Sequence, residues 1–241
     1  MARKTSIKKA TTKKSSKVDN KMLTLMFVDI VNYTKTTTQL SRELFSDMHD
    51  VFDSLVGETV EEFNGEIIKK IGDAFLITFT GATDGVHCGI AMQKKFMQYN
   101  EDYDLPAKLQ IRVALHSGDV MIKDNDVYGD AVNVASRIQS LAKPNHVVFS
   151  EAVYSAMNKG EIEYYHIGTR KVKGVQVPIR IFRAKTQEDI NKEYKKAKKK
   201  QRAKSSKQIR TILGGLMLII VITILIFFLI NYYNEFSSLF T

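Results

Sequence analysis

Residues 65–80 read GEIIKKIGDAFLITFT, two apolar runs on either side of the dipeptide Gly72-Asp73. A glycine-containing reversal between two such runs predicts a β-hairpin, because glycine adopts the backbone angles that a tight turn requires. Asp73 would then lie at the tip of the hairpin, where an aspartate is either a turn former or a ligand. The segment therefore predicts part of a sheet with a carboxylate at one end.

Patterns on the N-terminal side of this hairpin predict a strand and a helix. Residues 23–29 read LTLMFVD, a short apolar run that is typical of a buried strand ending at Asp29. Residues 41–63 place apolar side chains near helical spacing with acidic side chains opposite them. This spacing predicts a long amphipathic helix, which Gly65 would end.

The segments that follow the hairpin continue to alternate between the two patterns. We expect a helix at about residues 84–100, a strand through 109–118, a helix through 129–142, and strands near 146–150 and 178–184. The order of elements is mixed, with helices over one sheet. The fold class predicted from it is α+β and ferredoxin-like.

The positive charge of the chain is concentrated near its two ends. Of 241 residues, 36 are Lys or Arg and 26 are Asp or Glu. Residues 1–21 hold eight basic side chains and one acid, residues 192–210 hold ten and one, and residues 22–191 are acidic overall. Nucleic-acid recognition needs basic and aromatic side chains on one structured face, so this distribution argues against it. The single cysteine, Cys88, excludes an internal disulfide.

A long uncharged segment near the C-terminus predicts a membrane anchor. Residues 212–230 hold no charged side chain, and as a helix they would span about 28 Å, close to the hydrocarbon thickness of a bilayer. The alternative, a buried core helix, lacks an apolar segment after it to pack against. We expect a single transmembrane helix over 211–231 that acts as a tail anchor.

The basic residues before this segment predict its orientation, because positive flanks stay on the cytoplasmic side. The folded domain would then be cytoplasmic and the short C-terminal tail would not. The basic run either attracts anionic headgroups or is only a solvated linker. The predicted parts of the chain are a disordered basic tail over 1–21, a folded domain over 22–185, a juxtamembrane linker over 186–210, the helix over 211–231 and the tail over 232–241.

Two carboxylates of the predicted domain suggest a metal site. Asp29 at a strand end and Asp73 at a hairpin tip are 44 positions apart in sequence, yet they would meet if their strands are neighbours. Mg²⁺ prefers carboxylate oxygens together with substrate phosphates. Two aspartates beside an open space therefore suit a nucleotide-phosphate site, although an aspartate in a turn is often only a turn former.

Four ordered motifs resemble the class III nucleotidyl cyclase catalytic domain, the adenylate and guanylate cyclase family, over about residues 22–184. They are FVDIVNYT at 27–34, KKIGDAFL at 69–76, IRVALHSGDV at 111–120 and DVYGDAVNVASR at 126–137. The resemblance implies the α+β fold of that domain and a nucleotide substrate.

The resemblance also implies a metal site. Asp29, Asp73 and the backbone carbonyl of Ile30 match the family's ligands for two divalent ions, Mg²⁺ or Mn²⁺. Such ions lower the pKa of the attacking ribose hydroxyl and neutralise charge on the phosphates. Asn32 and Tyr33 depart from the glycine and phenylalanine that the family commonly has there, and Asn tolerates a positive φ.

Lys69 and Asp126 match the pair that selects the base in the family. A lysine can donate to N1 of adenine and an aspartate can accept from the 6-amino group, so the resemblance implies ATP as substrate. Guanylate cyclases of the family usually carry Glu and a small polar or Cys residue at these positions.

Asn133 and Arg137 lie one helical turn apart and match the family's transition-state pair. Arg112 and Lys173 match positions that bind the β- and γ-phosphates. His116 follows an apolar strand and Cys88 lies inside a predicted helix without a partner base, so we interpret both as packing residues.

The leading hypothesis is a membrane-anchored adenylate cyclase that acts as a homodimer with its sites at the subunit interface. The alternatives are a guanylate cyclase and a non-catalytic membrane-anchored nucleotide-sensing module. A phosphatase or generic ATPase would be expected to carry a G-x-x-x-x-G-K-[ST] loop, and the sequence has none.

Overall fold

The computed structural model describes residues 19–31, 41–103, 108–173, 175–187, 189–199, 201–202, 213 and 226. The chain divides into two compact units, Met1–Thr186 and Gln187–Thr241. In the second unit, residues 189–199 and 201–202 are helical. Among the described residues, no helix is long and apolar enough to cross a bilayer. The predicted span over 211–231 lies outside them except for Leu213 and Ile226.

Eight strands form one mixed sheet in the described part of the first unit. Its order is β2-β3-β1-β4-β6-β8-β7, and the short β5 pairs with β4. The β4–β6 pair is parallel and the others are antiparallel. The strands are β1 (Asp19–Ile30), β2 (Glu66–Ile71), β3 (Ala74–Phe79), β4 (Ile111–Lys123), β5 (Asp126–Tyr128), β6 (Val147–Ser150), β7 (Tyr164–Arg170) and β8 (Ile179–Ala184).

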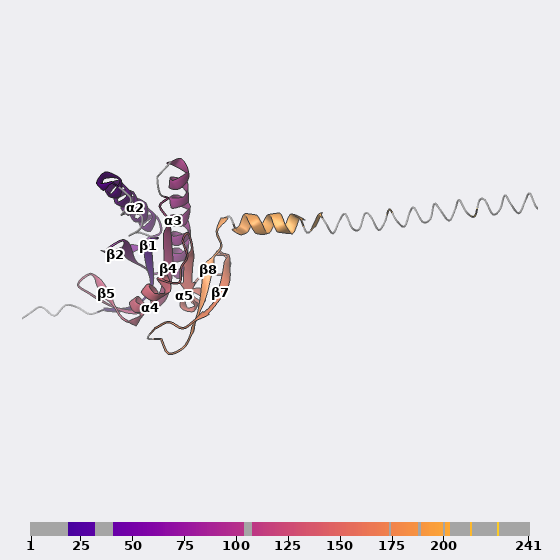
Figure 1. Ribbon diagram of the computed structural model, residues 1–241. Coiled ribbons are helices and arrows are strands. Elements are labelled where there is room, and N and C mark those ends of the chain that lie inside the picture. Colours follow the sequence, from indigo (N-terminus) through magenta and orange to yellow (C-terminus); the bar gives the residue numbers. More distant parts are fainter. Residues whose placement is uncertain are drawn as a thin grey trace, which may run out of the picture. The chain divides into compact units, whose positions relative to one another are not determined.

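Helices cover both faces of this sheet. They are α2 (Arg42–Glu62), α3 (Ala82–Asp102), α4 (Asp130–Gln139) and α5 (Glu151–Ala156). In Figure 1, α2 and α3 lie beside each other, and the Phe52 and Phe96 rings meet between them with centroids 5.9 Å apart. Met26 and Val28 of β1 belong to the same core cluster as these rings.

The opposite face of β1 packs against α4. Leu25 and Phe27 share a second core cluster with Ala131 and Ala135 of that helix. Because both faces of β1 are covered, its buried part reads as a continuous apolar run rather than an alternating pattern. This burial is why residues 23–29 carry the strand signal in the sequence.

The predicted α+β class is confirmed, and all the predicted helices and strands are present with shifted ends. The strand β1 begins at Asp19 rather than Leu23, because Asp19 and Lys21 pair with Ile122 and Val120 on the long strand β4. Residues 19–21 therefore belong to the sheet and not to the predicted disordered tail. The elements β5, α5 and β7 were not predicted.

Candidate functional site

The β2–β3 turn places Asp73 beside the end of β1. Gly72 has φ +63, which glycine adopts without a steric cost, and Ile71 pairs with Ala74 across the turn. On the other side of β3, Ala74 pairs with Asp29. The predicted meeting of Asp29 and Asp73 follows from this register, because β3 lies between β2 and β1.

Asp29 is buried, with 5% of its surface exposed. It lies opposite Arg112 on β4, whose Nε donates to Asp29 Oδ2 at 2.6 Å and whose Nη2 also contacts that oxygen. Burial raises the pKa of the Asp29 carboxyl, Arg112 opposes this, and the neighbouring Asp73 carboxyl raises the pKa further. The carboxyl therefore lies in a site that disfavours its own charge.

A divalent cation suits the two neighbouring carboxyls. Its positive charge would offset the cost of burying a charged Asp29 and the repulsion between the two carboxylates. Among the residues that the structure describes, no cluster of three or more His, Cys, Asp or Glu side chains could hold a metal by itself. The donor set thus suits an ion that takes further ligands from a substrate phosphate. Ile30, the third predicted ligand, ends β1 with its side chain in the core and its backbone paired with Ile111.

Lys69 and Asp126 form an ion pair between β2 and β5. Lys69 Nζ donates to Asp126 Oδ2 at 2.6 Å, and the other carboxylate oxygen accepts from the backbone N–H of Val127 at 2.8 Å. The Lys69 bond is the main cause that lowers the pKa of Asp126. The two residues assigned to base selection are therefore side by side on one chain.

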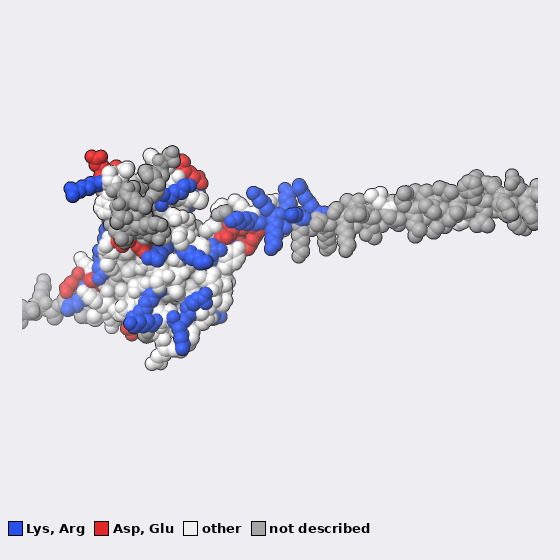
Figure 2. Space-filling view, viewed as in Figure 1, with Lys and Arg blue, Asp and Glu red and all other residues white. Residues whose placement is uncertain are grey.

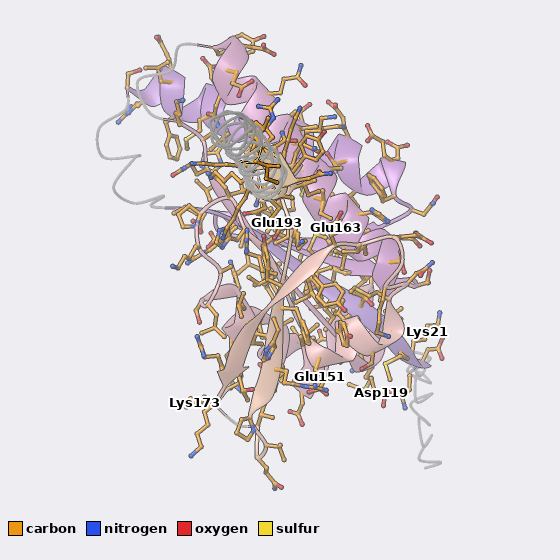
Figure 3. All side chains as sticks on the ribbon, turned by 90° about the vertical axis from the view of Figure 1, so that its right-hand side faces the viewer. Lys21, Asp119, Glu151, Glu163, Lys173 and Glu193 are labelled. Atoms are coloured by element: carbon orange, nitrogen blue, oxygen red, sulfur yellow. The ribbon has the colours of Figure 1, made fainter. Side chains whose placement is uncertain are left out.

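The helix α4 carries Asn133 and Arg137. Asn133 is exposed and Arg137 is half-buried, and Arg137 Nη1 donates to the backbone carbonyl of Lys173. Figure 3 shows Lys173 at the end of the β7–β8 hairpin, with its side chain directed away from the ribbon. The contact joins α4 to the segment that follows β7.

The predicted site residues thus form three groups. Asp29, Asp73 and Arg112 gather at the ends of β1 and β3, Lys69 pairs with Asp126, and α4 meets the segment of Lys173. The catalytic and binding roles of these residues stay predictions. Asn32 and Tyr33 lie outside the described residues.

Comparison with known proteins assigns the chain to a family. Residues 15–187 match the adenylate and guanylate cyclase catalytic domain. The chain belongs to this family. Among solved structures, the adenylyl cyclase CyaB from P. aeruginosa is 25% identical with a TM-score of 0.64, over 71% of this chain and 97% of that one. The adenylate/guanylate cyclase/hydrolase from Silicibacter pomeroyi has the same TM-score at 24% identity, over 70% and 98%.

Curated relatives of the cyclase domain are longer proteins. The serine/threonine-protein kinase pkn2 of Myxococcus xanthus is 31% identical over 169 residues, which are 70% of this chain and 20% of that protein. The putative adenylate cyclase 3 of Rhizobium meliloti is 28% identical over 170 residues, 68% and 28% respectively. The chain therefore spans less than a third of the length of either.

Two residues interpreted as packing residues have specific partners in this cyclase domain. His116 Nδ1 is 2.8 Å from Ser150 Oγ, and burial lowers the pKa of its ring. Cys88 is fully buried, its Sγ donates to the Thr59 carbonyl at 3.6 Å, and burial raises its pKa to about 12. A packing role is confirmed for Cys88. The His116–Ser150 bond had no sequence signal, since the two residues are 34 positions apart.

Proposed function

We propose that the protein is an adenylate cyclase that converts ATP to 3′,5′-cyclic AMP and pyrophosphate. The observation that carries the proposal is the 2.6 Å ion pair between Lys69 and Asp126. A lysine ammonium can donate to N1 of adenine and an aspartate can accept from the 6-amino group. Guanine presents a protonated N1 and a carbonyl oxygen instead, so both contacts would be mismatched.

In this reaction the ribose 3′-oxygen attacks the α-phosphorus and the hydroxyl loses its proton. The bond from the α-phosphorus to the oxygen that bridges it to the β-phosphorus breaks, and pyrophosphate leaves. Asp29, Asp73 and the carbonyl of Ile30 would hold two divalent ions, as the family generally does. When bound, Mg²⁺ or Mn²⁺ lowers the pKa of the 3′-hydroxyl and offsets charge on the phosphates.

Basic side chains of this chain would bind the phosphates. Arg112 carries its charge directly beside Asp29, so it lies next to the proposed phosphate position. Arg137 would stabilise negative charge on the transferring phosphate, and Asn133 on the same helical face would orient the ribose. Lys173, which is exposed, would contact the terminal phosphates.

We propose that the active form is a homodimer, since class III cyclases act as dimers. Asp29 and Asp73 of one chain would face Lys69, Asp126 and the α4 pair of the second. One chain carries all of these residues, so a homodimer would hold two complete sites. A non-catalytic nucleotide-sensing module would not need both acids.

We also propose that the C-terminal segment anchors the protein to a membrane with the cyclase domain in the cytoplasm. The support is the 19-residue uncharged run over 212–230 and the basic residues before it. Accessibility of the N-terminus to protease in sealed vesicles tests the orientation.

The nucleotide is tested with the full-length chain, ATP or GTP, and Mg²⁺ or Mn²⁺, with products separated by chromatography. We expect cyclic AMP from ATP and at least tenfold less cyclic GMP from GTP. The double variant Lys69→Glu/Asp126→Cys should lose most cyclic AMP formation and gain relative activity on GTP. Lys94→Gln, an exposed lysine on α3, is the control and should change neither rate.

Each alternative function has its own outcome in this assay. Preference of the unaltered chain for GTP would make it a guanylate cyclase. No cyclic product with either nucleotide or metal, from a folded dimer, would favour the non-catalytic module.

A further inference from the structure

A cavity of about 230 Å³ lies between the segment that follows α4 and the strands β7 and β8. It is lined by Leu141, Lys143, His146, Ile167, Arg170 and Ile181, and none of the predicted site residues is among them. Three of these side chains are apolar, three carry basic nitrogens and none is acidic. The composition is that of a site for a partly apolar anion.

One wall of the cavity is fixed by its backbone. Asn145 has φ +62, and its N–H donates to the Ile111 carbonyl at 2.8 Å. The carbonyl of His146 accepts from the N–H of Val113 at 3.0 Å and from Gln93 Nε2 at 3.3 Å. These bonds tie the segment of Lys143 and His146 to β4 and α3, so this wall is formed before any ligand arrives.

The opposite wall is shaped by a glycine. The β7–β8 register shifts between His166 and Gly168, and Gly168 has φ +110. A Cβ at that position would lie 2.9 Å from Arg170 Nη1 and would push the guanidinium aside, and the φ of +110 is one that L side chains rarely adopt. Arg170 Nη1 donates to the carbonyl of Thr169 at 3.1 Å, which holds the guanidinium against its own strand.

The two cations of the cavity, Lys143 and Arg170, have no acidic partner in the described part of the chain. Neither Lys143 nor Arg170 forms an ion pair with any residue that the structure describes. Figure 2 shows Lys and Arg side chains gathered toward the end of the unit where β7 and β8 are connected. Ile181 is buried, with 1% of its surface exposed, and forms the apolar base of the cavity. An anion bound here would therefore lie near two positive charges and against an apolar surface.

We propose that this cavity binds a small organic carboxylate, with its acid group on Arg170 and Lys143 and its apolar body against Leu141, Ile167 and Ile181. The volume lies below the 300–1,000 Å³ that drug-sized ligands occupy, so the ligand is small. A carboxylate suits the site because an arginine guanidinium binds it through two parallel hydrogen bonds.

An occupant would connect the same two segments that the Arg137–Lys173 contact already joins. Leu141 follows the helix that carries Arg137, and Arg170 precedes Lys173 in the same segment of chain. The ligand thus sets the position of α4 and regulates the cyclase rate. This regulatory part rests on the proposed function, whereas binding does not.

The test is calorimetric titration of the full-length chain with benzoate and with benzamide, its neutral isostere. We expect benzoate to bind at least tenfold more tightly than benzamide, and Arg170→Gln and Lys143→Gln each to weaken benzoate about tenfold. Lys94→Gln and Lys173→Gln are the controls and should bind benzoate like the unaltered chain. Thermal melts confirm that each variant is folded.

Several results would overturn the proposal. The first is that benzoate does not bind, and the second is that benzoate and inorganic phosphate bind with equal affinity. The third is that Lys173→Gln weakens benzoate binding and Arg170→Gln does not, which would place the anion at the phosphate-binding residues. Benzoate should also change the rate of cyclic AMP formation at least twofold, and not in Arg170→Gln. Binding without a rate change overturns the coupling to α4. If the chain has no cyclase activity, the proposed function is contradicted. The titration then still tests whether the cavity binds a carboxylate.

Discussion

The ionised carboxyl of Asp29 is unfavourable for the stability of the fold, although it suits the proposed metal site. Its carboxyl is buried, and the ion pair with Arg112 does not cancel the effect of burial and of Asp73 on its pKa. The folded chain therefore holds a proton on Asp29 to higher pH than the unfolded chain does. Stability that depends on this proton is present at low pH and is lost as the pH rises through the folded pKa.

Asp29→Asn, which resembles the protonated acid and does not titrate, tests this directly. With a chelator present, the melting temperature of the variant relative to the unaltered chain should rise as the pH is raised through the folded pKa of Asp29. Differential scanning calorimetry measures it. A difference for Asp29→Asn that stays constant with pH would contradict the assignment.

The same variant tests the metal site without an activity measurement. Mg²⁺ should raise the melting temperature of the unaltered chain at pH 7.5, because a ligand that binds only the folded state stabilises it. Asp29→Asn and Asp73→Asn should lose this shift, and both should lose at least about 100-fold of the cyclase rate. A Mg²⁺ shift that survives in both variants would place the ion elsewhere.

At the scale of the elements, two glycines have opposite roles. Gly57 lies inside α2 with no atom near an added Cβ, and Gly72 lies in the β2–β3 turn with φ +63 and equally open surroundings. Gly57→Ala should stabilise the fold by about 0.5–1 kcal/mol, and Gly72→Ala should destabilise it by about 1 kcal/mol. Urea unfolding of the two variants measures both, and changes of equal sign would refute the argument.

The start of α5 depends on Ser150, a fully buried side chain. Its Oγ caps the helix by accepting from the N–H of Val153 and also meets His116. Ser150→Ala should cost about 1–2 kcal/mol. Ser41→Ala removes the exposed cap of α2 and should cost less, about 0.5 kcal/mol. Equal losses in urea unfolding would mean that the His116 bond contributes nothing.

Elements with a strong local pattern could be predicted from the sequence, and those defined by their partners could not. The strand β1 contains a continuous apolar run, and the helices α2 and α3 are long and carry apolar side chains at helical spacing. By contrast, β5 has three residues and exists because it pairs with β4. The run YYHI in β7 has the residue types of a strand, a signal that could have been used.

The site divides in the same way. The residues could be chosen from the motifs, and the meeting of Asp29 with Asp73 was predicted on the condition that their strands are neighbours, which the β1–β3 pairing meets. The 2.6 Å bond between Lys69 and Asp126 joins positions 57 apart, and no local pattern reports such a pairing. The cavity beside Arg170 depends on Gly168 and a shift in strand register, which are properties of the folded backbone.

At the scale of the whole molecule, a shared site predicts complementation. Asp73→Ala and Arg137→Ala should each be inactive as homodimers. Mixed dimers would keep one intact site of two, so an equal mixture should recover about a quarter of the original rate. Product chromatography measures the recovery. No recovery, with mixed dimers confirmed by mass spectrometry, would mean that one chain forms a self-contained site.

Anchoring should promote the dimer, because two chains confined to a surface have a high effective concentration. A fragment of residues 1–186, the first compact unit, should show specific activity that rises with protein concentration. The full-length chain in vesicles should stay active at dilutions where the fragment has lost activity. If the fragment and the full-length chain have equal specific activities at all dilutions, the C-terminal segment does not promote dimer formation.

The Lys69–Asp126 pair also constrains how this lineage could change its nucleotide. A first mutation of Lys69 to an acid would set two carboxylates against each other, and a first loss of Asp126 would leave a lysine without its carboxylate partner. Under the proposed preference for ATP, either single step would weaken recognition of adenine before it creates recognition of guanine. A change of nucleotide in such a protein would therefore need both substitutions together.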